Sequence, residues 1–255
     1  MQLRILGCSG GIGQQLRTSS YLIDEDILLD AGTGVGDLSM DEMRKIKHIF
    51  ITHSHMDHIV SIPLMVDTLF SSLKQPLEIH ARAETIAVLK QHIFNWTIWP
   101  DFSALPDKQS PVLVFRPMQP GDVLDIDGRR IEMIEVSHTV PACGYAVTSA
   151  GRTLVYSGDT STNDTLWACL NKYARVDFMI VETAFSNHEI ELSKLAKHYC
   201  PDLLAADLKK FRHRPPLGIS HLKPGEEQRI MEECQIAMGS EWSLHQLATG
   251  ETFQI

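Results

Sequence analysis

The six residues 53–58, His-Ser-His-Met-Asp-His, hold three of the twelve histidines of this 255-residue chain. They follow an apolar segment of strand length, so we expect an extended backbone that turns the side chains of His53 and His55 to the same side. Asp57 and His58 stand where a helical pattern begins, and the turn can direct them toward a second point nearby. A solvated polar loop explains neither this spacing nor the apolar flanks. Because imidazole and carboxylate groups are the ligands of hydrolytic zinc sites, the segment predicts a site for two metal ions.

Three further polar residues stand at the carboxyl ends of predicted strands. They are His138 in EVSHTV, Asp159 in LVYSGDTS and His221 in LGISHLKPG. Functional residues often lie at this end of a strand. Each of them alone is a weak signal, because a single histidine there is more often an ordinary hydrogen-bonded residue. Together with residues 53–58 they indicate one site assembled from distant parts of the chain.

Strand-length apolar runs and longer segments with helical spacing occur in both halves of the chain, which predicts an α/β (α+β) fold. The length suits one large domain or two small ones, and no linker is evident, so we expect residues 1–255 to form a single domain. The stretch between Pro100 and Pro120 is expected to be a surface excursion, either a lid or an oligomer contact.

The glycine-rich residues 7–13 do not fit a dinucleotide-binding fingerprint. We expect a flexible turn with positive φ angles there, or else a loop close to a ligand.

Charge and hydropathy limit the partners of the chain. Lys and Arg number 23 and Asp and Glu number 32, and the net charge of −9 opposes a broad interface with extended nucleic acid. The sequence shows neither a basic leader followed by an apolar segment nor an apolar run of about 18 residues. We therefore expect a cytoplasmic protein without membrane contact.

The order HSHMDH, SHTVPACGY, YSGDTS, ISHLK resembles the metallo-β-lactamase superfamily over nearly the whole chain. This resemblance implies a four-layer αββα sandwich with the metal site at one edge of the two sheets. The histidine at position 55 differs from the H-x-E-x-D pattern of the flavodiiron proteins in this superfamily, and so favours zinc hydrolysis over diiron redox chemistry. Carried over by position, His53, His55 and His138 would hold one metal, Asp57, His58 and His221 the other, and Asp159 would bridge the two.

The implied cofactor is a pair of divalent metal ions, with Zn²⁺ favoured and Mn²⁺ or Fe²⁺ accepted by the same ligands. A bound metal lowers the pKa of water from near 15.7 toward about 7, so a hydroxide bridging two metals is a nucleophile at neutral pH. The two ions can also accept two oxygens of a phosphoryl group. This chemistry suits a phosphodiester substrate.

A closer resemblance is to class II cyclic-nucleotide phosphodiesterases. It is carried by GCSGG, RTSSYLID, LLDAGTGVG, THSHMDHIVSIPLMVD, and the run from VETAF through HLKP. It implies hydrolysis of 3′,5′-cAMP, with cGMP as a second candidate, to the 5′-nucleotide, and it suggests a homodimer. Base recognition is unassigned. Arg17, Thr33 and Gly34 lie in segments that could reach a ligand; the plain alternatives are a turn for Thr33 and Gly34 and a solvated cation for Arg17.

Two residues resemble the Glu and His that phosphodiesterase branches of the superfamily carry near the scissile phosphate: Glu182 in VETAFSN and His198 in LAKHYCP. The resemblance implies that His198 contacts the phosphate or protonates the leaving oxygen, while Glu182 orients it. With Asp57 these are the expected catalytic residues. The alternative for His198 is a cation at the carboxyl end of its helix.

Other activities keep the same metal ligands. A tRNA 3′-processing endonuclease shares the Glu/His pair but would need a basic surface and usually a flexible RNA-clamping arm. A lactam, thioester or lactone hydrolase differs only in its pocket. A non-catalytic binding protein descended from such enzymes would have lost ligands, whereas all seven are present. The remaining histidines, among them His48, His80 and His245, show no partner pattern and are expected to be structural or surface residues.

Overall fold

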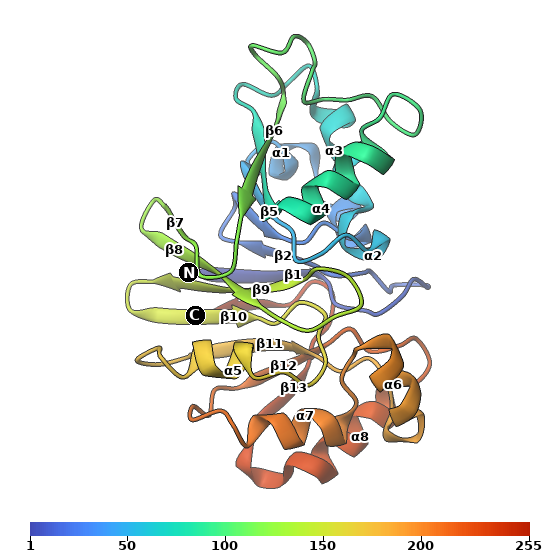
Figure 1. Ribbon diagram of the computed structural model, residues 1–255, viewed down its shortest axis with the longest axis vertical. Coiled ribbons are helices and arrows are strands. Elements are labelled where there is room, and N and C mark those ends of the chain that lie inside the picture. Colours follow the sequence, from blue (N-terminus) through green and yellow to red (C-terminus); the bar gives the residue numbers. More distant parts are fainter.

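Two seven-stranded mixed sheets pack face to face, with helices on both outer faces, in the computed structural model of residues 1–255. Figure 1 shows the resulting four layers, with the earlier part of the chain in the upper half and the later part in the lower half. The C-terminal strand returns to pair with the N-terminal strand of the first sheet. The αββα sandwich expected from the sequence is confirmed.

The first sheet has the order β14-β1-β2-β3-β4-β5-β6 and the second the order β13-β12-β11-β10-β9-β8-β7. The strands of the first sheet are β1 (Gln2–Gly7), β2 (Ser20–Ile23), β3 (Ile27–Leu29), β4 (His48–Phe50), β5 (Leu77–Arg82), β6 (Leu113–Met118) and β14 (Thr252–Gln254). Those of the second are β7 (Val123–Ile126), β8 (Arg129–Glu135), β9 (Cys143–Ser149), β10 (Arg152–Tyr156), β11 (Phe178–Glu182), β12 (Leu217–Ser220) and β13 (Leu244–Gln246).

Short helices and turns supply the outer layers. Beside the first sheet lie η1 (Thr33–Asp37), α1 (Met40–Met43), α2 (Met56–Ile59), α3 (Ser61–Leu69), α4 (Ala83–Val88) and η2 (Leu89–Ile93). Beside the second lie α5 (Thr165–Leu170), η3 (Asn187–Glu189), α6 (Ile190–Ala196), α7 (Pro201–Leu208), α8 (Glu227–Met238) and η4 (Gly239–Glu241). None of these helices has the length and apolar character needed to cross a membrane.

Each sheet is apolar on both faces, so the core has three parts. Successive strand residues point to opposite faces, and in β10 Val155 packs under the helices while Leu154 and Tyr156 fill the space between the sheets. All three are at most 2% exposed. Burial of a large apolar side chain contributes about 1.5 to 3 kcal/mol before the loss of chain entropy, and this drives the layers together.

Parallel pairing brings the ends of several strands to one edge of the sandwich. Strand β4 is parallel to β3 and β5, and β11 is parallel to β10 and β12. The loops that follow β4, β10, β11 and β12 therefore meet. These are the loops in which the sequence places most of the candidate site residues.

The stretch between Pro100 and Pro120 is only partly irregular. Its later part forms β6, which lies at the edge of the first sheet, so the surface excursion ends at residue 112. Just before this stretch, Trp96 and Ile98 are 63% and 62% exposed. Whether this region serves as a lid or an oligomer contact stays a prediction.

A charged cluster joins the two sheets at the other end of the sandwich. Arg129, at the start of β8, donates two hydrogen bonds of 2.5 and 2.8 Å to Asp26 and one of 3.2 Å to Asp24, both in the turn between β2 and β3. Burial raises the pKa of Asp26, but the hydrogen bond and charge of Arg129 outweigh it, so that this pKa lies below its ordinary value.

We expect Asp26→Asn to lower the free energy of unfolding by about 2 to 3 kcal/mol at neutral pH, because it leaves the buried guanidinium of Arg129 without its main partner. The native pKa of Asp26 is depressed, so its stabilising effect is complete above the unfolded value of about 4 and is lost as the pH falls below it. Urea unfolding at several pH values measures both effects. Asp41→Asn, which breaks an exposed pair with Arg44, is the control and should cost less than about 1 kcal/mol; an equal loss in both variants would contradict the proposed role of Arg129.

Candidate metal centre

The carboxylate of Asp159 lies at the middle of the site, directly after β10, and is buried. Its Oδ2 atom is 3.7 Å from Nε2 of His53 and 3.3 Å from Nε2 of His58. Its Oδ1 atom is 3.4 Å from Nδ1 of His221. Since both oxygens face imidazole nitrogens, this carboxylate is placed to serve two neighbouring ions.

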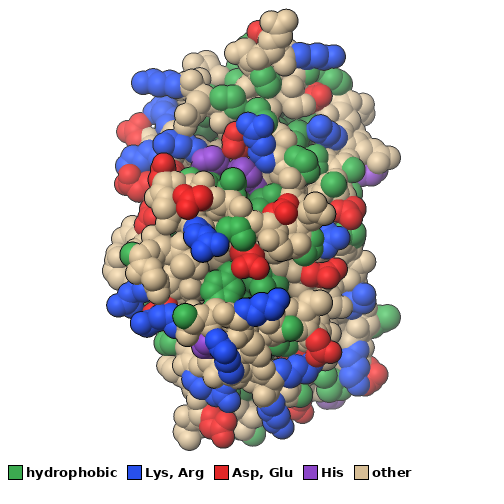
Figure 2. Space-filling model, turned by 60° about the vertical axis from the view of Figure 1, so that its left-hand side comes forward, with side chains coloured by type: hydrophobic (Ala, Val, Ile, Leu, Met, Phe, Trp, Pro, Cys, Tyr) green, Lys and Arg blue, Asp and Glu red, His purple; other side chains and the backbone are tan.

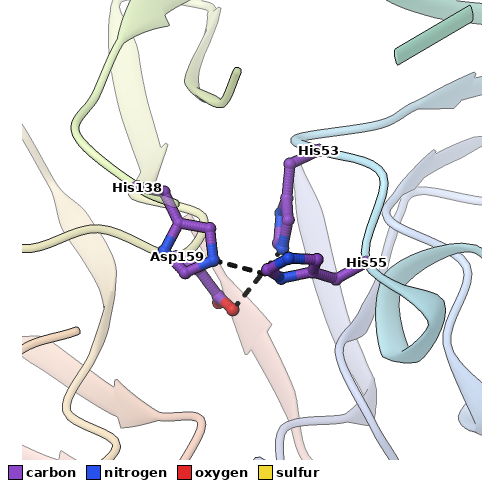
Figure 3. A group of neighbouring side chains, drawn as sticks. All are labelled: His53, His55, His138 and Asp159. Carbon is purple, nitrogen blue, oxygen red and sulfur yellow. Dashed lines mark hydrogen bonds and ion pairs between the residues drawn. The ribbon is translucent and has the colours of Figure 1, made fainter. Parts of the chain in front are cut away.

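The first group of donors consists of His53, His55, His138 and Asp159, whose donor atoms all lie within 4.8 Å of one another. Figure 3 shows the four side chains pointing toward a common centre, the first two from the loop after β4 and the other two from loops of the second sheet. The Nδ1 atom of His55 is 3.1 Å from Nε2 of His138. This is the set that the sequence assigns to the first metal.

The second group consists of Asp57, His58, Asp159 and His221. Helix α2 begins at Met56, so Asp57 and His58 occupy its first turn. The Oδ2 atom of Asp57 is 3.6 Å from Nε2 of His58 and 3.8 Å from Nε2 of His221. All seven residues singled out in the sequence therefore come together, in two groups that share Asp159.

These residues fit a pair of cations. The Nε2 atoms of His53 and His58 are buried and have no hydrogen-bond partner, which is costly unless another species satisfies them. Burial holds the pKa of His53 well below its ordinary value and lowers that of His138 to about 4 and that of His221 to about 3. Neutral imidazoles with free lone pairs are the form that binds a divalent metal.

The carboxyl of Asp159 and the imidazole of His58 shift each other's pKa. Burial raises the pKa of Asp159, but His221 and His58 outweigh it and hold this pKa well below its ordinary value. Burial lowers the pKa of His58, but Asp159 and Asp30 outweigh it and raise this pKa well above its ordinary value. Asp159 is therefore held ionised, and a cation bound between the two residues would take the place of the positive charge on His58.

Asp30 is a supporting residue that sequence reasoning did not assign. It is buried, and its carboxylate lies 2.6 Å from Nδ1 of His58 and accepts hydrogen bonds of 2.8 Å from the backbone N–H of Thr52 and from the hydroxyl of Tyr156. This contact keeps Nε2 of His58 directed toward Asp159. The available signal was an acid directly after an apolar strand, as for Asp159.

Glu182 and His198 form a second pair beside Asp159. The Nδ1 atom of His198 is 2.8 Å from Oε1 of Glu182, and the carboxylate also accepts hydrogen bonds from the backbone N–H groups of Thr160 and Ala184, at 3.0 and 3.1 Å. Burial raises the pKa of Glu182; burial lowers that of His198, but the neighbouring carboxylate outweighs it and raises it. Helix α6 ends at Ala196, two residues before His198, and the ring of His198 bonds to Glu182; whether this residue contacts a phosphate or acts as a cation at the helix end stays a prediction.

The glycine-rich residues 7–13 lie against the site. The expectation of positive φ angles is wrong, since none of these glycines has one. Glycine is needed here because another backbone segment lies too close for a side chain. A Cβ atom on Gly10 would lie 2.4 Å from the carbonyl oxygen of His221. The second interpretation, a loop close to a ligand site, fits this position.

The three residues in segments that could reach a ligand, Arg17, Thr33 and Gly34, make local contacts. The guanidinium of Arg17 pairs with Asp37 at 2.8 Å, and the hydroxyl of Thr33 accepts a 2.9 Å hydrogen bond from the backbone N–H of Thr18. Gly34 approaches the carbonyl oxygen of Leu6 too closely for a side chain. Thr33 and Gly34 lie in the short helical turn η1, as their plain alternative expects, whereas Arg17 is ion-paired rather than a solvated cation.

The fold and the arrangement of the site agree with the comparisons to known proteins. A family model described as "Beta-lactamase superfamily domain" matches residues 25–238. The chain belongs to the beta-lactamase superfamily. Among the relatives of this superfamily member, a "Probable 3′,5′-cyclic-nucleotide phosphodiesterase" of Yersinia pestis is 29% identical over 246 residues, which cover 83% of this chain and 69% of the relative.

One further relative and one solved structure are also similar to this superfamily member. "Ribonuclease Z" of Haloarcula marismortui is 32% identical over 155 residues, which cover 58% of this chain and 47% of that protein. The structure of yeast PDE1 aligns with a TM-score of 0.82 at 16% identity and covers 98% of both chains. At this level of identity the similarity concerns the fold alone.

We expect Asp30→Ala to weaken metal binding by about 10- to 100-fold, because it frees the ring of His58 without removing a ligand. Metal content after dialysis against a competing chelator, followed by titration calorimetry, measures the change. Asp37→Ala is the matched control, since Asp37 also pairs with a neighbour but lies outside the site. Unchanged affinity in Asp30→Ala would show that the contact with His58 does not support the centre.

Proposed function

We propose that this protein is a metal-dependent phosphodiesterase that hydrolyses 3′,5′-cyclic nucleotides, cAMP foremost and cGMP second, to 5′-nucleotides. The observation that carries the proposal is the pair Glu182–His198 beside two donor groups that share Asp159. Such a site would place a proton donor beside two bound metal ions. The Yersinia pestis relative, which bears the name of this activity and aligns over most of the chain, supports the substrate class.

His53, His55 and His138 would hold one divalent ion, Asp57, His58 and His221 the other, and Asp159 would contact both. When bound, such ions lower the pKa of water and offset charge on phosphoryl oxygens. The nitrogen and oxygen donors favour Zn²⁺, and they also accept Mn²⁺ or Fe²⁺.

His198 is proposed to protonate the leaving O3′ oxygen. Its Nδ1 atom is engaged by Glu182, which leaves Nε2 as the nitrogen available to a ligand. Backbone N–H groups hold the carboxylate of Glu182 on both oxygens, so it fixes the tautomer and orientation of the ring. A positioned general acid of this kind contributes about 10²- to 10⁴-fold to the rate.

A tRNA 3′-processing endonuclease is the second candidate. The Haloarcula marismortui relative named ribonuclease Z favours it, although the match covers less than half of that protein. The net charge of −9 opposes a large RNA interface. A lactam, thioester or lactone hydrolase is the remaining alternative.

We further propose that the enzyme is a homodimer and that its substrate is a small-molecule nucleotide.

Turnover of 3′,5′-cAMP, cGMP, a precursor tRNA and a β-lactam by Zn²⁺- or Mn²⁺-loaded protein tests the proposal. We expect 5′-AMP to form, and its formation to fall to background in Asp57→Ala, which removes a donor of the second group. Circular dichroism checks that the variant is folded. Cleavage of the tRNA or the lactam with none of the cyclic nucleotides would replace the proposed substrate by that of the rival.

His198→Ala should lower kcat for cAMP by about 10²- to 10⁴-fold with little change in metal content, because the leaving alkoxide loses its proton donor. A p-nitrophenyl phosphodiester separates this role from a structural one, since its leaving group needs no proton. We expect that substrate to lose far less than cAMP, and Glu182→Gln to lie between wild type and His198→Ala. Equal losses on both substrates would assign His198 to binding or folding rather than to proton transfer.

A further inference from the structure

A second cluster of metal-ligating side chains lies on the first sheet, away from the centre described above. His48 on β4 is the cross-strand partner of Glu78 on β5, and His80 lies two residues further along β5 on the same face. The donor atoms of the three residues all lie within 4.8 Å of one another. The sequence showed no partner pattern for these histidines, because the cluster exists only through the register of β4 and β5.

The three donor atoms form a nearly regular triangle. Nδ1 of His48 is 3.1 Å from Nε2 of His80, and Oε2 of Glu78 is 3.5 Å from each of these nitrogens. In a tetrahedral zinc site with bonds of about 2.0 to 2.1 Å, neighbouring ligand atoms are about 3.3 to 3.4 Å apart. The triangle therefore has the size of one face of such a site. A hydrogen bond between the two imidazoles accounts for only one of its three edges.

Neighbouring groups hold the three side chains in this arrangement. The Oε1 atom of Glu78 accepts hydrogen bonds of 3.0 and 2.6 Å from Arg116 on β6, which leaves Oε2 facing the histidines. The ring of His80 stacks on Phe50, with centroids 4.4 Å apart and planes 12° apart, and its side chain is 3% exposed. Such supporting contacts are typical of metal ligands.

The protonation of the histidines suits a metal. Burial and the neighbouring His48 lower the pKa of His80 to about 4, and burial lowers the pKa of His48. Both rings are therefore neutral at neutral pH and offer a lone pair each. Glu78 supplies a negative charge, because Arg116 keeps its pKa below the ordinary value despite burial.

The cluster opens into a cleft of about 730 Å³ where the edge strands β6 and β7 of the two sheets face each other. Asp122, Asp125 and Asp127 line the cleft together with Lys47. Figure 2 looks onto this side of the molecule and shows histidine side chains in its upper half among acidic and basic ones. A cation bound to the cluster could therefore take a water molecule from the cleft as its fourth ligand.

The cluster is separate from the candidate metal centre. His48 begins β4, whereas His53 follows its end, and five extended residues span about 16 Å. We propose that His48, Glu78 and His80 form a third, mononuclear site for a divalent metal ion such as Zn²⁺, with an open fourth position toward the cleft. Two imidazoles and one carboxylate with an open position are a known zinc ligand set.

Zinc content of the full chain, measured by plasma mass spectrometry after equilibration with excess Zn²⁺ and dialysis, tests this site. Wild type should hold one more zinc ion per chain than His48→Ala, whatever the occupancy of the other centre. His245→Ala is the matched control, because His245 also contacts a carboxylate, Glu251 at 2.9 Å, outside the cluster. It should keep the wild-type content, and an equal content in wild type and a folded His48→Ala would overturn the proposal.

Crystals of the wild-type protein grown with Zn²⁺ provide a second measurement that does not depend on a variant. Anomalous scattering at the zinc edge should give a peak among Nδ1 of His48, Oε2 of Glu78 and Nε2 of His80. A map with peaks at the dinuclear centre and none at the cluster would also overturn the proposal.

Discussion

The buried carboxylate of Asp159 is the constraint on which the rest of the site depends. A charge in the interior is tolerated only with partners, and its two oxygens face His53 and His58 on one side and His221 on the other. These partners come from both sheets. The closure of the sandwich and the assembly of the site are therefore one event, since neither sheet alone can satisfy this group.

The side chains of the site come from loops and from the first turn of α2, and hydrogen bonds hold them in position. Asp30 fixes His58, backbone N–H groups fix Glu182, and the carbonyl of Lys197 lies 2.9 Å from Nδ1 of His138. Lys197 itself has a positive φ of 52°, which places its carbonyl beside that ring. Preorganisation of this kind keeps donor groups in position before a ligand arrives.

The molecule carries two clusters of metal-ligating residues that arise in different ways. The site at the strand ends consists mainly of residues that follow strands, and the sequence predicts them because polar residues follow apolar strands. The cluster of His48, Glu78 and His80 lies within strands, where a polar residue every second position looks like an exposed face. In the folded protein these three residues lie beside the edge strands β6 and β7 and line a cleft.

The sequence by itself determined the mixture of strands and helices and a site for two metal ions at residues 53–58, because alternation along a strand and the turn into α2 are local properties of that segment. The four-layer sandwich and the division of the ligands between two ions were implied by the resemblance that the motifs carry. The sequence also indicated His138, Asp159 and His221, since these polar residues each follow an apolar strand and occur in one chain with residues 53–58. Tertiary structure decided the roles of Asp30, of the glycines in residues 7–13 and of the cluster around Glu78. Each of these depends on strand register or on backbone contact between segments far apart in the chain, and such contacts leave no periodic signal in the sequence.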